Sequence, residues 1–99
     1  MDKKEIIEKL KEYKELISES FDLDRMYLFG SYSNGRASEF SDIDVAVIVN
    51  SIDEDFFTYS PRLWKLRRNI DERIEPVLFK KGQDESGFLS EIEKNGILI

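Results

Sequence analysis

The segment Ile43–Val49, which reads Ile-Asp-Val-Ala-Val-Ile-Val, restricts the possible folds more than any other part of the chain. Except for one aspartate it is apolar throughout and rich in β-branched side chains, as expected of a central strand covered on both faces. Shorter apolar runs predict two further strands, at 25–29 and 74–79. Pro76 places the second of these at the edge of the sheet, because proline cannot donate a ladder hydrogen bond.

Helices are expected before and between these strands. Apolar residues at steps of three and four predict a first helix from Asp2, its N-cap, to about Ser20. A short helix or turn is expected over 31–36. Ser60-Pro61 is a typical helix start, with a hydroxyl cap and a proline in the first position, and it predicts a helix over 61–70.

A last helix is expected near the carboxyl end of the chain. Asp84 is the predicted cap, and the helix should turn Phe88, Leu89 and Ile92 inward and stop at Asn95-Gly96. The remaining residues, 97–99, are too few to assign. The expected fold is an α/β domain in which a small three-stranded sheet is flanked by about four helices. The 99 residues suit a single domain, over 1–99.

The composition excludes several kinds of chemistry. The chain has no Cys and no His, which removes disulfides, thiolate chemistry, Ser-His triads and most zinc sites. A net charge of −6 disfavours a nucleic-acid partner on electrostatic grounds but is compatible with an acidic site for divalent cations. No apolar stretch approaches membrane-spanning length, and the first residues do not lead into a signal sequence. We therefore expect a cytoplasmic protein that does not associate with a membrane.

Two carboxylates stand at the start of the most apolar strand. Asp42 and Asp44 are two positions apart, so the alternation of a strand puts both side chains on one face, with Cα atoms roughly 6.5–7 Å apart. Carboxylates at that spacing can converge on one or two magnesium ions. The alternative is structural, with Asp42 ending a loop and Asp44 exposed to solvent. A bound cation would offset the cost of placing two acids beside apolar residues.

Gly30-Ser31 follows the first predicted strand directly and opens a helical turn. Backbone N–H groups at such a turn bind phosphate, and glycine lets a ligand approach the main chain closely. Strand-Gly-Ser is also a common turn without any ligand. The site has a topological consequence. Gly30-Ser31 can meet Asp42 and Asp44 only if the first two strands run antiparallel.

Taken together, these residues resemble a known signature. Gly30-Ser31, a spacer and Asp42-Ile43-Asp44 are similar to the Gly-Ser…Asp-x-Asp pattern of the polymerase β nucleotidyltransferase superfamily. Gly35 and Ala37 also look like its minimal nucleotidyltransferase branch. The resemblance covers nearly the whole chain and implies the nucleotidyltransferase fold. It also implies a third carboxylate on the next strand, where Glu75 is the match. Strands two and three should then be parallel, and the sheet mixed.

The sequence departs from the family pattern at two places. Glu75 stands where minimal members commonly carry Asp, and an exposed edge-strand charge is its alternative reading. Ser33-Asn34 stands where many members carry Ala-Arg. Arg36 would then supply the phosphate contact in place of that arginine, unless it is a solvated surface residue.

The resemblance implies an activity and a partner. Asp42, Asp44 and Glu75 would hold two Mg²⁺ ions, with Mn²⁺ as a substitute, and Gly30, Ser31 and Arg36 would bind a nucleoside triphosphate. AMP from ATP would pass to a hydroxyl, making the chain a nucleotidyltransferase and, more narrowly, a protein adenylyltransferase. Minimal members pair with a separately encoded helical protein of the HEPN class in toxin–antitoxin modules. The alternatives are a catalytically weak nucleotide-binding antitoxin, or transfer to a small molecule or an RNA end.

Three further features have no assigned role in this scheme. One is a basic cluster consisting of Arg62, Lys65, Arg67, Arg68 and Arg73, which could bind phosphate or an acidic partner or simply be solvated. The others are two apolar segments that could dock a partner if exposed, Phe56-Phe57 with Tyr59 and the tail Ile97–Ile99.

Overall fold

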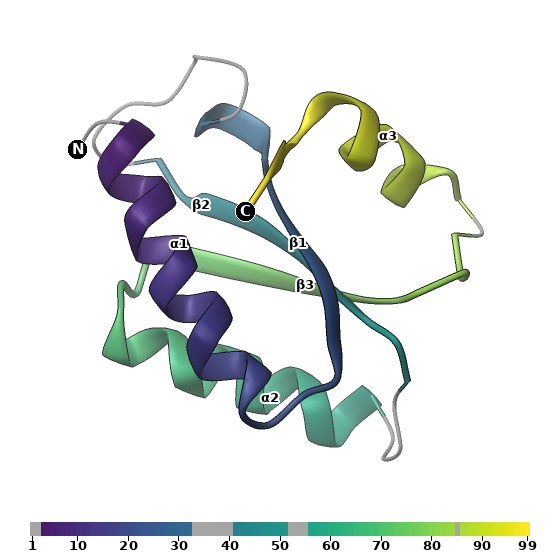
Figure 1. Ribbon diagram of the computed structural model, residues 1–99, viewed down its shortest axis with the longest axis horizontal. Helices are drawn as coiled ribbons and strands as arrows, with labels where there is room; N and C mark the ends of the chain where they lie inside the picture. Colours follow the sequence, from purple (N-terminus) through teal and green to yellow (C-terminus); the bar gives the residue numbers. More distant parts are fainter. Residues whose placement is uncertain (1–2, 33–40, 52–55, 85) are drawn as a thin grey trace.

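The computed structural model describes residues 3–32, 41–51, 56–84 and 86–99. Its helices and strands follow in the order α1 (Lys3–Ser18), β1 (Leu23–Phe29), the 3-10 helix η1 (Gly30–Tyr32), β2 (Ile43–Val49), α2 (Phe56–Leu66), the 3-10 helix η2 (Arg67–Asn69), β3 (Ile74–Lys80), α3 (Phe88–Asn95) and β4 (Ile97–Leu98) (Figure 1). No helix in these ranges is both long and apolar enough to cross a membrane.

The sheet is mixed, as predicted. Its strand order is β3-β2-β1-β4, with β1 antiparallel to both of its neighbours and β2 parallel to β3. Pro76 lies in β3, which is an edge strand of this sheet, as its missing N–H predicted. The fourth strand was not expected. It forms because Ile97 and Leu98 pair with Leu28 and Tyr27 on the other side of β1.

Helices cover both faces of β2, which confirms the reading of its apolar run. Val45, Val47 and Val49 belong to the core cluster that α1 and α2 complete, and Ala46 and Ile48 pack on the opposite face with Leu89 and Ile92 of α3. These five side chains of β2 are fully buried. Figure 1 shows α1 and α2 together and α3 apart from them. Asp44 is two residues before Ala46 and therefore lies on the same face of the sheet, the one that α3 covers.

Two helix predictions need correction. The helix assigned to 61–70 begins at Phe56 and ends at Leu66, with Pro61 inside it. The backbone before Pro61 is therefore already helical, although the proline nitrogen cannot donate to the carbonyl one turn earlier. The predicted short helix over 31–36 is a 3-10 helix at Gly30–Tyr32, and 33–36 fall outside the described residues. Three α-helices, rather than about four, lie in the described ranges.

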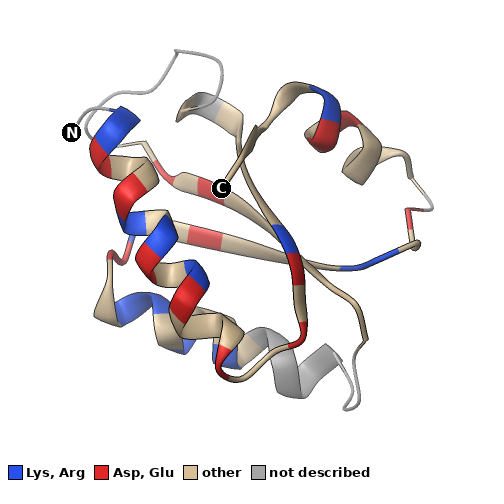
Figure 2. Cartoon of the chain, in the orientation of Figure 1, with Lys and Arg blue, Asp and Glu red and all other residues tan. Residues whose placement is uncertain are grey.

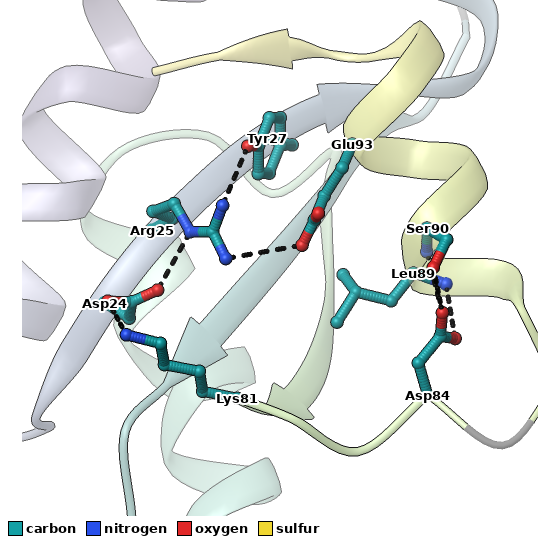
Figure 3. Close-up of polar contacts among 8 residues, drawn as sticks. All are labelled: Asp24, Arg25, Tyr27, Lys81, Asp84, Leu89, Ser90 and Glu93. Carbon is teal, nitrogen blue, oxygen red and sulfur yellow. Dashed lines mark hydrogen bonds and ion pairs between the residues drawn. The ribbon is translucent and has the colours of Figure 1, made fainter.

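Two polar groups contact α3 (Figure 3). The N-cap position is Gly87 rather than Asp84, but the Asp84 carboxylate still accepts from first-turn amides, those of Leu89 at 2.9 Å and Ser90 at 3.0 Å. The guanidinium of Arg25 on β1 reaches Glu93 of α3 at 3.4 Å. Leu89 is buried as predicted, but 43% of Phe88 is exposed, contrary to the prediction that it turns inward.

Candidate active site

The pairing of three strands brings two of the predicted site residues side by side. In the register of the sheet, Asp44 on β2 lies opposite Phe29 on β1 and beside Glu75 on β3. Figure 2 shows acidic positions next to each other on these neighbouring strands. Asp42 comes two residues before Asp44, just outside β2. Neighbouring strands are about 4.8 Å apart, so the carboxylates on β2 and β3 share one small region of the sheet face.

The pKa shifts of these side chains depend on one another. Burial raises the pKa of Asp44, and the negative charge of Asp42 raises it further. The pKa of Glu75 is also raised, first by burial, then by the charges of Asp42 and Asp44 and by a side-chain hydrogen bond with Asp42. Arg67 opposes this shift. The charges of these carboxylates therefore act on one another, with Asp42 affecting both Asp44 and Glu75.

Gly30 comes into contact with one of these carboxylates. It begins η1 at the end of β1 with φ +75°, in the left-handed region that glycine tolerates best. A β-carbon added there would lie 2.3 Å from Oδ2 of Asp44. The phosphate-binding turn predicted from Gly30-Ser31 and the carboxylate predicted from Asp-x-Asp are thus in direct contact. Arg36, the third predicted nucleotide-binding residue, lies outside the described residues.

The oxygen donors suit a hard divalent cation such as Mg²⁺ or Mn²⁺. None of the six ion pairs that join two described residues uses Asp42, Asp44 or Glu75. Within the described ranges, however, no three acidic side chains form a preformed metal-binding cluster.

The basic cluster predicted from the sequence divides into separate groups. Arg73 donates to the carboxylate of Asp71 at 2.9 Å and to the hydroxyl of Tyr32 at 3.4 Å, so it connects the start of β3 to η1. Arg67 lies over the Trp64 ring, 4.6 Å from its centroid. The other three residues are exposed: Arg62, Lys65 and Arg68. Tyr32, which the sequence did not single out, is therefore part of the framework beside the site.

The proposed docking segments are only partly available. Ile97 and Leu98 form β4, and Ile97 and Ile99 pack against the core. Leu98 alone remains largely exposed, at 59%. The side chains of Phe56, Phe57 and Tyr59 lie outside the described part of the chain.

Comparisons with known proteins place the chain in a family. A family model described as "Polymerase beta, Nucleotidyltransferase" matches residues 4–99. A candidate protein adenylyltransferase of Methanocaldococcus jannaschii is 34% identical over 101 aligned positions, which cover 96% of this chain and 99% of the relative.

Two solved structures share the fold. A candidate nucleotidyltransferase from Sulfolobus solfataricus superposes with a TM-score of 0.68 at 24% identity, over 97% of this chain and 80% of that one. The structure of a toxin–antitoxin with AMP-PNP superposes with a TM-score of 0.61 at 24% identity, over 99% of this chain and 72% of that one.

Proposed function

This chain belongs to the polymerase β nucleotidyltransferase family, and from that premise we propose that it transfers AMP from ATP to a hydroxyl group of a partner protein. The observation that carries the proposal is the position of Asp44. It touches Gly30 on one side and lies in register with Glu75 on the other. A triphosphate at the Gly30 turn would therefore lie against the carboxylates.

In the proposed reaction, an oxygen of the acceptor hydroxyl forms a bond to the α-phosphorus of ATP. The bond between that phosphorus and the oxygen bridging to the β-phosphate breaks, pyrophosphate leaves, and the hydroxyl proton passes to solvent. Bound Mg²⁺ would stabilise the charge on the α-phosphate and on pyrophosphate and would lower the pKa of the attacking hydroxyl. The protein contributes positioning and electrostatics, as is usual in phosphoryl transfer.

Each residue of the site has a proposed role. Asp42, Asp44 and Glu75 would hold the Mg²⁺ ions, for which their oxygen atoms and neighbouring negative charges are suited. The backbone amides of the Gly30-Ser31 turn would bind the outer phosphates, because glycine allows them a close approach. Arg36 would add a contact to the same phosphates.

The proposed acceptor is a separately encoded helical protein of the HEPN class, with this chain as its antitoxin. Three facts support a protein acceptor. The relative from Methanocaldococcus jannaschii carries the name of a protein adenylyltransferase. A toxin–antitoxin structure shares the fold. The net charge of −6 disfavours a nucleic-acid acceptor, because each phosphate contact needs a compensating cation.

The test is to purify the chain together with the product of its neighbouring gene, add ATP and Mg²⁺, and measure the partner's mass. A gain of one AMP unit or a small multiple, absent with Asp42→Asn, supports the proposal. No association with a neighbouring product, together with transfer to a small molecule or RNA end, would refute the antitoxin role while leaving nucleotidyl transfer in place.

A second candidate is an antitoxin that binds nucleotide and neutralises its partner by contact alone. The observation in its favour is that the described acids do not form a preformed three-ligand cluster. Stable co-purification with no change in the partner's mass, at Mg²⁺ and ATP concentrations that saturate binding, would favour this second function over the first.

A further inference from the structure

A pocket of about 200 Å³ lies between the end of β1 and one face of α3. Phe29 and Gly30 form its β1 side, and its α3 side consists of Phe88, Glu91, Ile92 and Asn95. We propose that this pocket binds the purine base of the nucleotide and thereby selects which nucleoside triphosphate the protein uses. This inference rests on the proposed nucleotidyl transfer, and it adds a site for the base to the site for the phosphates.

The position of the pocket relative to the carboxylates supports a base as its occupant. Gly30 lines the pocket and also touches Asp44, so one residue joins the pocket to the proposed phosphate site. Asp44 and α3 are on the same face of the sheet, because Asp44 is two residues from Ala46 on β2, and Ala46 packs against α3. A nucleotide with its phosphates at Gly30 and Asp44 can therefore place its base against α3 without crossing the sheet.

The size of the pocket favours one ring system. Sites that enclose a whole small ligand have volumes of about 300–1,000 Å³. A volume of about 200 Å³ is below that range and suits part of a ligand. The phosphates and the ribose would then lie outside the pocket, over the Gly30 turn and the carboxylates.

The apolar wall of the pocket is aromatic. The ring of Phe88 meets Phe29 edge-on at 5.7 Å and Phe79 at 6.0 Å between centroids. These contacts hold Phe88 in place, yet 43% of the residue remains exposed. An aromatic ring that is both fixed and open to solvent is suited to stack on a flat base, and such stacking contributes substantially to nucleotide binding.

The polar side of the pocket is suited to the edge of a purine. Glu91 and Asn95 are four residues apart and so lie one above the other on α3, and the Asn95 amide nitrogen donates to the Glu91 carbonyl at 3.2 Å. A carboxylate accepts hydrogen bonds from exocyclic amino groups, and an asparagine amide can bind two neighbouring purine atoms. Adenine and guanine both offer such groups, so the proposed ligand class is a purine, and the experiment separates the two.

The test compares the binding of two ligands by calorimetry, with Mg²⁺ and without a partner protein. One is a non-hydrolysable ATP analogue and the other is inorganic tripolyphosphate, which has no base. Phe88→Ala should raise the Kd of the ATP analogue about tenfold and leave that of tripolyphosphate unchanged. Phe88→Leu should resemble Phe88→Ala, and Phe88→Tyr should resemble the wild type. Lys94→Ala, on α3 but outside the pocket, should change neither constant.

The outcomes separate this proposal from the proposed function. If wild type binds tripolyphosphate as tightly as the ATP analogue, or if Phe88→Ala weakens both equally, the base pocket is wrong while the phosphate site stands. If wild type binds neither ligand, both proposals fail. Wild type should also bind ATP or GTP more tightly than CTP and UTP, because the two rings of a purine stack on more of Phe88. Phe88→Ala should reduce this preference, and the tighter of the two purines identifies the base.

Discussion

The backbone of Gly30 lies against the carboxylate of Asp44, so close that a β-carbon at residue 30 would be 2.3 Å from Oδ2 of Asp44. The two residues come from different strands, and the antiparallel pairing of Phe29 with Asp44 brings them together. Gly30 therefore has two requirements that only glycine meets. Its φ of +75° is left-handed, and the space that a side chain would fill is occupied by a proposed metal ligand.

Gly30→Ala should abolish most nucleotidyl transfer. Ordinary contact with a β-carbon begins near 3.4 Å, so the Asp44 carboxylate would have to move by about 1 Å. A displacement of that size in a catalytic site can reduce the rate by about 100-fold. The left-handed backbone should add about 1–2 kcal/mol of destabilisation. Steady-state rates and urea unfolding measure the two effects separately.

Gly82→Ala is the matched control for this variant. Gly82 has a similar φ of +86°, but nothing lies within 4 Å of the β-carbon that alanine would add. The stability of the two variants should therefore fall by a similar amount, while the activity of Gly82→Ala stays near that of the wild type. Equal loss of activity in both variants would show that stability, and not the position of Asp44, explains the effect at Gly30.

Asp42→Asn and Asp44→Asn should each abolish transfer without unfolding the protein. Burial and the charge of Asp42 raise the pKa of Asp44, which means that the ionised form of Asp44 is disfavoured in the fold. At pH 7 the removal of either charge should therefore leave thermal stability unchanged or raised when no metal is present. A variant that melts well below the wild type under metal-free conditions would indicate a structural role and contradict the assignment.

Mg²⁺ should stabilise the wild type against heat, more strongly with ATP present, because ligands that bind only the folded state stabilise it by mass action. Glu75→Gln should weaken this effect less than Asp44→Asn. Glu75 lies on the edge strand β3, whereas Asp44 lies on β2, which has a neighbouring strand on each side, and it touches Gly30. If Glu75→Gln keeps its rate within about threefold of wild type, or about 0.7 kcal/mol of barrier, the role of a third carboxylate is wrong.

The sequence predicted the strand Ile43–Val49 and the strand directions because both depend on strong local patterns. A continuous apolar run needs cover on both faces, and the two halves of the site can meet only if β1 and β2 are antiparallel. The structure confirms these points. The contact between Gly30 and Asp44 was not predictable in the same way, because it depends on the register between two strands.

Other features depend on long-range packing that no local pattern contains. The pairing of Ile97 and Leu98 with β1 joins segments about 70 positions apart in the chain. Ser60-Pro61 favoured a helix start, but helical backbone begins before it, at Phe56. Phe88 has an apolar side chain at a position expected to face inward, yet it begins α3 beside an open pocket and stays partly exposed.

The last prediction concerns the ion pairs at the start of β3. The carboxylate of Asp71 accepts from Arg73 at 2.9 Å and from Lys9 of α1 at 3.0 Å. The Arg73 carbonyl in turn accepts from the amide of Ile43 at 2.8 Å, so this group helps to align β2 and β3 where Asp44 and Glu75 meet. Asp71→Asn should reduce the free energy of unfolding by about 2 kcal/mol at pH 7, as expected for charge-assisted hydrogen bonds.

The pH dependence of this loss tests its cause. The hydrogen bond from Arg73, with the help of Lys9, holds the pKa of Asp71 well below the value of about 3.9 expected for an unfolded chain. The contribution of the ionised Asp71 is thus complete above about pH 5 and is lost as the pH falls below about 4 toward the folded pKa. Urea unfolding of wild type and Asp71→Asn should therefore converge in acid. Asp22→Asn, at an exposed site bonded to Asn50, should change stability by less than about 0.5 kcal/mol. A difference between wild type and Asp71→Asn that stays constant from pH 7 to pH 3 would show that side-chain shape, and not charge, accounts for the stability that Asp71 provides.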